Sequence, residues 1–305
     1  MKKILLTAIG GDISQSVANC IRDYDDSIKI IGTDIHSKHS GNLYVDEFFI
    51  VPEASHPDYL ERVKEIIKSN NIDVSIPINE SELKLFVESP NQINLIHSGK
   101  DIVSIGLDKL KTIKSFEKYG LKVPWTVDAN QEYPREYPCI FKPRFGSGSK
   151  SIFIINSENE AHFFKEKYAN YVFQEYLDPY EKELTCCLYV SKNGSIKTIQ
   201  FERILVGGLT GWAQVVKKES VDKLLLEISK TFNLYGSINI QLRITKSGPM
   251  IFEINPRFSS TCFMRHKLGF TDVVWSLQEY FNKPIKLNDS PVGATAVRFQ
   301  GIKIL

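Results

Sequence analysis

One short stretch near the end of the sequence, residues 252–257, places three polar side chains at alternating positions. In an extended strand Glu253, Asn255 and Arg257 share one face, because side chains alternate with a period of two. Carboxylate and amide oxygens are the hard ligands that Mg²⁺ prefers, and an arginine beside them can bind a phosphate or a carboxylate. The pattern predicts a site for a cation and an anion. The alternative is the polar outer face of an antiparallel sheet.

Alternating polar residues also mark the preceding strand-forming segment, in which Asn239, Gln241 and Arg243 share a face. A serine–glycine turn signal at 247–248 separates the two segments. Pairing of the two strands as a hairpin is therefore expected to bring Gln241 close to Glu253.

The loop 144–151 is rich in glycine and serine and lies between two strand-forming segments. Its backbone N–H groups, together with the positive charge of Lys142, Arg144 and Lys150, are suited to surround a triphosphate. The loop is not a Walker A motif, which requires G-x-x-x-x-G-K-[ST] at the start of a helix. A flexible hairpin tip that binds nothing is the alternative.

Three segments of different pattern must position these residues. Residues 1–107 alternate strand and helix signals, which predicts a parallel sheet covered by helices. Residues 108–170 begin with a helix and continue as a hairpin with a second helix over it. Residues 171–305 are rich in strands joined by turn signals, an α+β pattern with antiparallel hairpins. The candidate site is expected between the second and third segments.

A second glycine motif lies in the first segment, where Gly10 and Gly11 follow the first strand and Asp34 ends the second. This order is typical of a dinucleotide-binding domain, but the G-x-G-x-x-G spacing is absent. The charge of Asp12 would also repel a pyrophosphate at the helix N-terminus. A nicotinamide-dependent dehydrogenase is therefore disfavoured against a sheet whose first turn simply needs glycine.

Composition narrows the classes of function. The length of 305 residues predicts two or three domains. With 38 basic and 36 acidic residues, the formal charge of +2 is too balanced for a dedicated nucleic-acid binder. No apolar run approaches the ~18 residues of a membrane span. The 5 cysteines lack C-x-x-C spacing, which predicts neither a zinc site nor a disulfide framework and favours a cytoplasmic location.

The order of these motifs resembles the ATP-grasp enzymes, in particular single-chain relatives of the carbamoyl-phosphate synthase large subunit and of carboxylate–amine ligases. The motifs that carry the resemblance lie at 10–11, 31–34, 46–52, 108–109, 120–124, 140–149, 173–177, 183–185, 241 and 253–258. They cover nearly the whole chain, to about residue 270, and the last two are the most specific.

The resemblance implies a fold of mixed α/β and α+β class, the ATP-grasp fold with an N-terminal Rossmann-like domain. Residues 1–107 would form this pre-ATP-grasp domain. Residues 108–170 would form the small lid subdomain, and residues 171–305 the C-terminal subdomain with the metal site.

The resemblance also implies a role for each motif residue. Lys109 and Lys142 would neutralise the ATP phosphates, and Gly146, Ser147, Gly148 and Ser149 would cover them. Adenine would be bound by Glu175, Tyr176 and Leu177, and the ribose would be held by Glu183. One or two Mg²⁺ ions, with Mn²⁺ as a substitute, would be ligated by Gln241, Glu253 and Asn255. The transferred phosphoryl group and the acyl phosphate would be stabilised by Arg203, Arg257 and Lys142.

The activity implied is that of an ATP- and Mg²⁺-dependent ligase, which joins a small carboxylate to an amine or ammonia through an acyl phosphate. A carbamoyl-phosphate-synthase-like phosphorylation of bicarbonate or carbamate is one alternative, and a non-catalytic nucleotide-binding subunit is another. The expected partners are small molecules, with neither nucleic acid nor membrane, and a homodimer is left open. One departure stands out: many relatives carry aspartate where this chain has Cys187.

Overall fold

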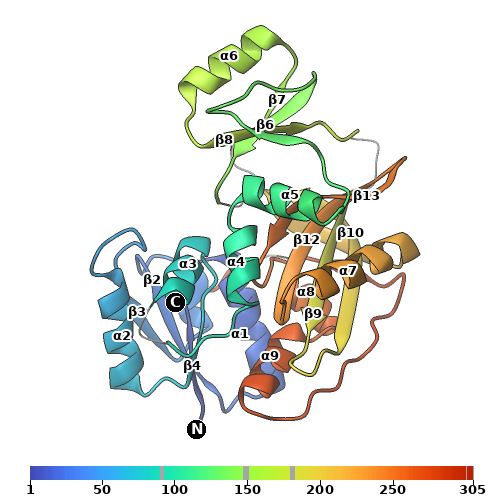
Figure 1. Cartoon of the computed structure of the whole chain (residues 1–305). Coiled ribbons are helices and arrows are strands. Elements are labelled where there is room, and N and C mark those ends of the chain that lie inside the picture. The colour runs from blue at the N-terminus through green and yellow to red at the C-terminus, as the bar shows by residue number, and fades with distance from the viewer. Residues whose placement is uncertain (90–92, 147–150, 179–182, 300, 305) are drawn as a thin grey trace.

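Three β-sheets follow one another along the described part of the chain, each with its own covering helices (Figure 1). The computed structural model describes residues 1–89, 93–146, 151–178, 183–299 and 301–304. The small sheet lies at the top of Figure 1, and the N-terminal and large sheets lie side by side below it. Within these residues, no helix has both the length and the apolar character needed to cross a membrane.

The N-terminal sheet is parallel, with strand order β3-β2-β1-β4. Its strands are β1 (Lys3–Leu6), β2 (Lys29–Asp34), β3 (Glu47–Ile50) and β4 (Val74–Ile76). Its helices are α1 (Asp12–Tyr24), α2 (Tyr59–Asn70) and α3 (Glu80–Glu88), with a 3₁₀ turn at Ser40–Leu43. The predicted parallel sheet is confirmed. A strand expected at 93–96 is reduced to a single bridge between Ser75 and Leu95.

Apolar residues of β1 point alternately to the two faces, as the period of a strand requires. Leu5 packs against Val63 of α2, whereas Ile4 and Leu6 pack in the cluster that contains Val17 of α1. Helices therefore cover both faces of this sheet, which is what parallel strands need.

Two helices, α4 (Lys100–Gly106) and α5 (Lys109–Lys118), connect the first sheet to the second. The second, small sheet is antiparallel, with order β5-β8-β6-β7. Its elements are β5 (Thr126–Asp128), β6 (Cys139–Pro143), β7 (Phe153–Ile155), β8 (Tyr171–Glu175) and the helix α6 (Glu158–Lys167). Because β8 pairs with both β5 and β6, this strand belongs to the small sheet. The domain division at 170/171 stays a prediction, and strand pairing favours a division after Glu175.

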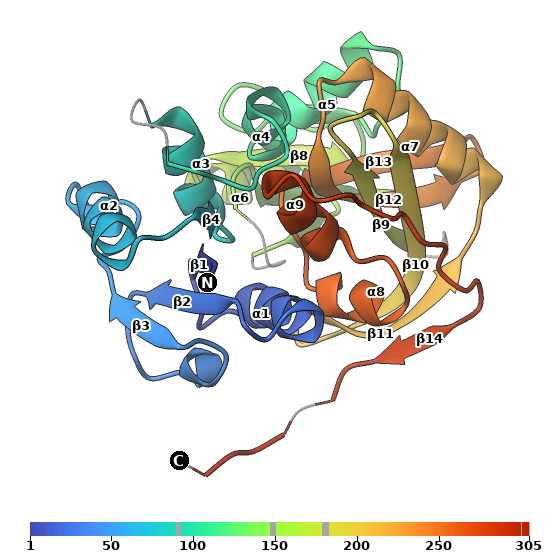
Figure 2. The same cartoon turned by 90° about the horizontal axis from the view of Figure 1, so that it is seen from below.

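The large sheet has the order β13-β12-β9-β10-β11-β14, with antiparallel neighbours throughout. Its strands are β9 (Glu183–Val190), β10 (Ile196–Val206), β11 (Leu209–Val216), β12 (Gly236–Thr245), β13 (Gly248–Asn255) and β14 (Thr295–Val297). The helices α7 (Glu219–Thr231), α8 (Cys262–Lys267) and α9 (Asp272–Tyr280) pack around it. Figure 2 shows β14 at the sheet edge and the chain beyond it leading away from the body.

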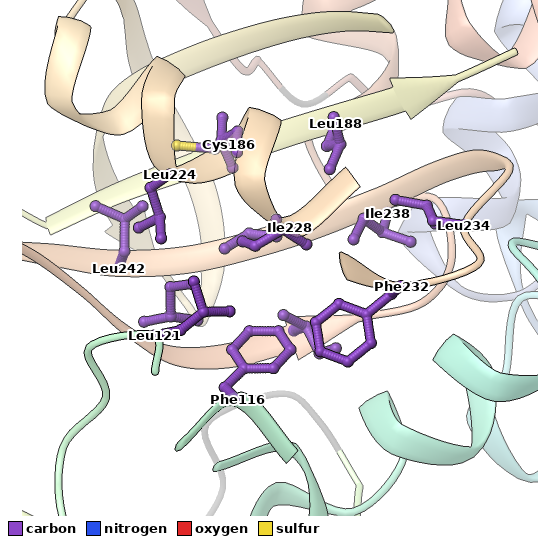
Figure 3. Close-up of a cluster of buried hydrophobic side chains, with 14 of the residues drawn as sticks. Phe116, Leu121, Cys186, Leu188, Leu224, Ile228, Phe232, Leu234, Ile238 and Leu242 are labelled. Atoms are coloured by element: carbon purple, nitrogen blue, oxygen red, sulfur yellow. The ribbon is translucent and has the colours of Figure 1, made fainter. Parts of the chain in front are cut away.

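A cluster of buried apolar side chains joins α7 to one face of the large sheet (Figure 3). Leu224 and Ile228 of α7 pack in one cluster with Cys186 and Leu188 of β9, and the rings of Phe116 and Phe232 lie 5.0 Å apart at its edge. This contact fixes α5 against the large sheet and so positions the start of the second segment.

Candidate active site

A cavity of about 480 Å³ lies between the small sheet and the large sheet, and Ile13 of the N-terminal part reaches one end of it. Its volume is typical of sites that bind small molecules or nucleotides. The predicted site residues that line it are Lys109, Lys142, Gly146, Glu175, Tyr176, Leu177, Glu183, Arg203, Gln241, Glu253, Asn255 and Arg257. Ser147, Gly148 and Ser149, with Lys150, lie outside the described residues.

The hairpin of β12 and β13 forms the floor of the cavity. As expected from the sequence, Gln241 pairs with Glu253, and Asn239 pairs with Asn255. The register shifts beyond Gln241, so that Phe252 bulges out of the ladder and lines the cavity as well. Asn239 and Asn255 are only 2% and 5% exposed, which counts against a merely solvated polar face.

The ammonium group of Lys142 is buried beside this hairpin, because β6 alternates between core and cavity. The side chain is 4% exposed, and Nζ donates to the backbone carbonyl of Phe252 at 3.4 Å. Burial lowers the pKa of Lys142 to about 8, with the nearby Glu253 carboxylate opposing and Lys109 reinforcing the shift. The cavity thus holds an ammonium ion that burial destabilises and that an anion bound nearby would stabilise.

Two arginines share one carboxylate at the part of the cavity wall formed by β9. Glu183 Oε1 accepts from Arg203 Nη2 at 2.9 Å, and its Oε2 accepts from Arg243 Nη2 at 3.3 Å. The residues predicted to contact the ribose and the γ-phosphoryl group are therefore in direct contact with each other.

At the hinge after β8, Glu175 uses its side chain to fix the backbone. Its Oε2 accepts from the backbone N–H of Trp125 at 3.1 Å, and the chain continues through Tyr176 and Leu177 along the cavity wall. Before it, Gln174 also lines the cavity and donates to Thr126 at 2.9 Å. The motif at 173–177 includes Gln174, but sequence reasoning assigned this residue no role, since a glutamine in a strand carries no signal of its own.

A residue that sequence reasoning also missed, Glu80, joins the N-terminal part to the cavity. Its Oε1 accepts from Arg257 Nη2 at 2.9 Å, and the same nitrogen donates to Asn255 Oδ1 at 3.3 Å. Glu80 is the first residue of α3, where Asn79 caps the helix by accepting from the backbone N–H of Ser81. This asparagine cap after a strand was the available signal.

Arg144, which was expected to contribute charge to a phosphate site, is not among the described residues that line the cavity. Arg144 instead forms ion pairs with Asp108 at 2.7 Å and with Asp128 at 3.0 Å. Asp108 also caps α5 by accepting from the backbone N–H of Leu110 and Lys111. Arg144 therefore fixes the base of its loop to α5 and to the small sheet.

The first glycine turn is filled by the protein itself. A Cβ at Gly10 would meet the ring of His39 at 2.7 Å and a carboxylate oxygen of Asp34 at 3.0 Å, and the Gly10 N–H donates to that oxygen at 2.8 Å. Asp12 forms an ion pair with Arg298. The simple reading, in which this turn needs glycine for close packing, accounts for the motif.

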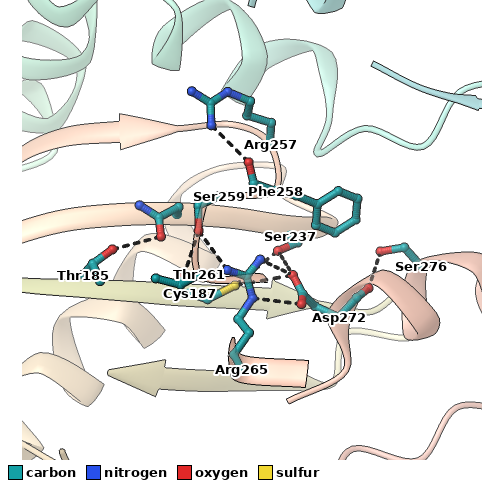
Figure 4. A network of polar contacts seen from close by, with 11 residues as sticks. Thr185, Cys187, Ser237, Arg257, Phe258, Ser259, Thr261, Arg265, Asp272 and Ser276 are labelled. Carbon is teal, nitrogen blue, oxygen red and sulfur yellow. Dashed lines mark hydrogen bonds and ion pairs between the residues drawn. The ribbon is translucent and has the colours of Figure 1, made fainter. Parts of the chain in front are cut away.

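A buried network lies under the cavity and accounts for part of the departure at Cys187 (Figure 4). Cys187 Sγ lies 3.2 Å from Ser237 Oγ and 3.7 Å from a carboxylate oxygen of Asp272. Asp272 pairs with Arg265 at 2.7 Å, and both side chains are fully buried. Arg265 also donates to Ser259 at 2.8 Å, and Ser259 lines the cavity. An acid is thus present beside Cys187, supplied by α9.

A cavity between a small antiparallel lid sheet and a large antiparallel sheet, preceded by a Rossmann-like parallel sheet, defines the ATP-grasp architecture. A family model described as "ATP-grasp domain" matches residues 107–261, and one described as "PylC-like, N-terminal domain" matches residues 4–96. The chain belongs to the ATP-grasp family, and the predicted fold is confirmed.

Two curated relatives and one solved structure are similar to this chain. The chain is 26% identical over 180 residues to an uncharacterized protein of Methanocaldococcus jannaschii, covering 56% of this chain and 46% of that protein. It is 36% identical over 92 residues to the D-alanine–D-alanine ligase of Petrotoga mobilis, covering 28% of this chain and 30% of the ligase. The chain thus spans less than half the length of these relatives. The ADP complex of an N5-carboxyaminoimidazole ribonucleotide synthetase shares the fold, with a TM-score of 0.76, 19% identity and coverage of 96% of this chain and 80% of that one.

Proposed function

We propose that the chain binds ATP with Mg²⁺ in the main cavity and joins a small carboxylic acid to an amine or ammonia through an acyl phosphate. The observation that carries the proposal is the pairing of Gln241 with Glu253, next to Asn255, with the buried ammonium of Lys142 at the same hairpin. Oxygen ligands and a buried ammonium ion in one cavity suit a complex of a metal ion with phosphate groups.

The ligand set fits magnesium in a particular way. Glu253 offers one carboxylate, whereas Gln241 and Asn255 offer neutral amide oxygens. Such hard oxygens suit Mg²⁺, which is usually held by one or two carboxylates together with substrate phosphates. A single carboxylate binds a free divalent cation weakly, so we expect the metal and the nucleotide to bind together. Mn²⁺ has the same ligand preference and is the expected substitute.

The nucleotide is placed by the walls on either side. We assign adenine recognition to the backbone of Tyr176 and Leu177, because Glu175 holds the hinge through Trp125. The phosphates then lie towards Lys142. Lys109, whose Nζ donates to the Gly146 carbonyl, approaches from the loop side, and Glu183 is left for the ribose.

The chemistry follows from the charge of the acceptor. A carboxylate repels nucleophiles, and transfer of the γ-phosphoryl group to it creates a leaving group that an amine can displace. Lys142, Arg203 and Arg257 compensate the negative charge that develops during this transfer, and their fixed positions avoid reorganisation at the moment of reaction. Arg257, which Glu80 orients from the N-terminal part, is the residue we expect at the acceptor carboxylate.

The test is a phosphate-release screen in which ATP and Mg²⁺ are offered with carboxylic acids, with and without amines or ammonium, and with bicarbonate. Release that depends on a carboxylic acid, with a coupled product only when an amine is present, supports the ligase. Release with bicarbonate alone would point instead to the carbamoyl-phosphate-synthase-like reaction. Nucleotide binding without release under any pair would favour a non-catalytic nucleotide-binding subunit.

A further inference from the structure

A second cavity of about 470 Å³ lies where the N-terminal part meets the large sheet, away from the site described above. It is lined by α3, by residues 93–100, by the turn at Lys192, by the start of β12 and by α9. The helices α3 and α4 lie side by side in Figures 1 and 2. Its volume is in the usual range for small-molecule sites.

The walls of this cavity combine an apolar surface with hydrogen-bond donors. The apolar part is formed by Phe86, Val87, Ile93, Leu95, Ile96 and Tyr280. Lys100 and Lys192 bring two ammonium groups to the same space, and both side chains are exposed. Lys100 has no hydrogen-bond or ion-pair partner among the residues that the structure describes. Lys192 Nζ makes a long contact of 3.3 Å with the backbone carbonyl of Glu279.

The carboxylate of Glu279, which lines this cavity, already accepts hydrogen bonds from the protein. Glu279 Oε1 accepts from the backbone N–H of Lys192 at 2.8 Å, and its Oε2 accepts from the Tyr189 hydroxyl at 2.8 Å. These bonds hold the carboxylate at the cavity wall and leave the lysines as the available charges. The local field therefore favours an anion.

Tyr235 adds a third donor. His97 Nδ1 accepts from the Gly99 backbone N–H at 3.1 Å, so the proton of the neutral ring is on Nε2. That nitrogen lies 2.7 Å from the Tyr235 oxygen, which also lies 3.3 Å from Nδ1; with the proton on Nε2 the hydroxyl oxygen accepts from it, and its own O–H remains a donor. Burial and the charge of Lys100 lower the pKa of His97, which favours the neutral ring.

The segment that lines the second cavity also touches the main one. Ser98, 1% exposed, donates from Oγ to the Pro256 carbonyl at 2.9 Å, and Pro256 lies between the cavity residues Asn255 and Arg257. The helix α4 begins at Lys100 and ends at Gly106, where an added Cβ would meet the Pro256 ring at 2.8 Å. The segment from Ser98 to Gly106 therefore contacts Pro256, beside the main site, at two places.

We propose that the second cavity binds a small organic anion with an apolar body, and that its occupancy changes nucleotide affinity in the main cavity through Ser98 and α4. The binding part is independent of the proposed function. The linkage part rests on it, since it requires nucleotide to bind in the main cavity.

The binding part is tested with the fluorescent probe 8-anilinonaphthalene-1-sulfonate, titrated onto the full chain. We expect saturable 1:1 binding that benzoate competes for and that benzyl alcohol does not. The double variant Lys100→Ala/Lys192→Ala should bind the probe about tenfold more weakly, since each charge-assisted contact is a strong one. The matched control is Lys223→Ala/Lys230→Ala, which removes two exposed lysines of α7 and should bind like the wild type. Equal binding by both double variants, or an absence of saturable binding, overturns the proposal.

The linkage part is tested by measuring ADP affinity calorimetrically with Mg²⁺, with and without saturating probe. We expect a change of about fivefold or more that levels off as probe or nucleotide is raised, as linkage between two sites requires. Displacement that grows without limit would place the probe in the main cavity and refute the assignment. Ser98→Ala should retain probe binding and lose the change in ADP affinity. If ADP does not bind at all, the proposed function and the linkage fail together, while the probe titration still decides the second site.

Discussion

Replacement of Lys142 is expected to have two opposite effects. It should raise the free energy of unfolding in the absence of nucleotide, and it should weaken the binding of nucleotide. The side chain is 4% exposed, and its pKa is lowered from 10.5 to about 8, first by burial and further by Lys109. At neutral pH the group is still charged, so the folded protein carries the cost of keeping an ammonium ion in a desolvated place. Lys142→Met keeps the length of the side chain and removes that cost.

The magnitude follows from the pKa. The difference between 10.5 and about 8, at about 1.4 kcal/mol for each pKa unit, corresponds to a cost of about 3 kcal/mol. The contact of Nζ with the Phe252 carbonyl, worth about 1 kcal/mol, is lost with the charge. We therefore expect Lys142→Met to raise the free energy of unfolding without nucleotide by about 2 kcal/mol.

The pH dependence has a definite sign. The pKa in the folded protein is below that of the unfolded chain, so the unfolded chain binds the proton more tightly between pH 8 and pH 10.5. The cost of Lys142 is complete below pH 8 and disappears as the pH rises through this window. The advantage of Lys142→Met over the wild type should therefore be constant below pH 8 and shrink towards pH 10.

Urea unfolding with and without Mg²⁺ and ADP measures both halves of the prediction. With nucleotide, the phosphates pair with the ammonium ion, and Lys142→Met should bind ADP about 10- to 100-fold more weakly. The control Lys118→Met removes an exposed lysine of α5 and should change stability by no more than about 0.5 kcal/mol. A Lys142→Met protein that is less stable without nucleotide, or that binds ADP normally, would refute the reasoning and make Lys142 a structural residue.

Three further predictions concern the surroundings of the cavity. Glu253→Gln keeps the side-chain volume and should abolish the Mg²⁺ dependence of ADP binding; because the Glu253 carboxylate offsets part of the burial cost of the Lys142 ammonium, the urea midpoint without nucleotide should fall. Persistent Mg²⁺ dependence would exclude this residue as a ligand. Glu80→Gln removes the partner that orients Arg257, so phosphate release should fall at least tenfold. The affinity for ADP, measured by calorimetry, should stay within about twofold of the wild type. A parallel loss of phosphate release and of ADP affinity would contradict a role of Arg257 at the acceptor. Asp272→Asn leaves Arg265 buried without its carboxylate and should cost about 3–5 kcal/mol in urea unfolding; a loss below about 1 kcal/mol would mean that water reaches the pair.

The part of the site that the sequence could predict is the part determined by local periodicity. Glu253 and Asn255 share a face because strand side chains alternate, and the turn at 247–248 was sufficient to predict the partner Gln241. The parallel N-terminal sheet was equally readable, because strand and helix signals alternate there. In both cases the information lies within a few tens of residues.

The rest depends on contacts between distant positions. Arg144 was expected at the phosphates because it sits in a basic, glycine-rich loop, yet Asp108 and Asp128 neutralise it from other elements. Glu80 lies 177 positions from Arg257, and no local pattern indicates that pairing. The strand β11 has no clear local signal for a different reason: two glycines precede it at 207–208 and Gly211 lies within it, yet pairing with β10 overrides the low strand propensity of Gly211.

The near-neutral charge of the chain conceals how unevenly the charge is placed. Among the described residues, the cavity is lined by the cations Lys109, Lys142, Arg203, Arg243 and Arg257 and by the carboxylates Glu175, Glu183 and Glu253. Burial of Lys142 between the two sheets lowers its pKa, with Lys109 adding to the shift and the carboxylates of Glu253 and Glu183 opposing it. A nucleotide with its metal ion is itself negative overall. Its binding would therefore stabilise the buried positive charge, which is unfavourable in the folded protein without a ligand. For the proposed phosphoryl transfer, such preformed ions would compensate the developing charge without having to move.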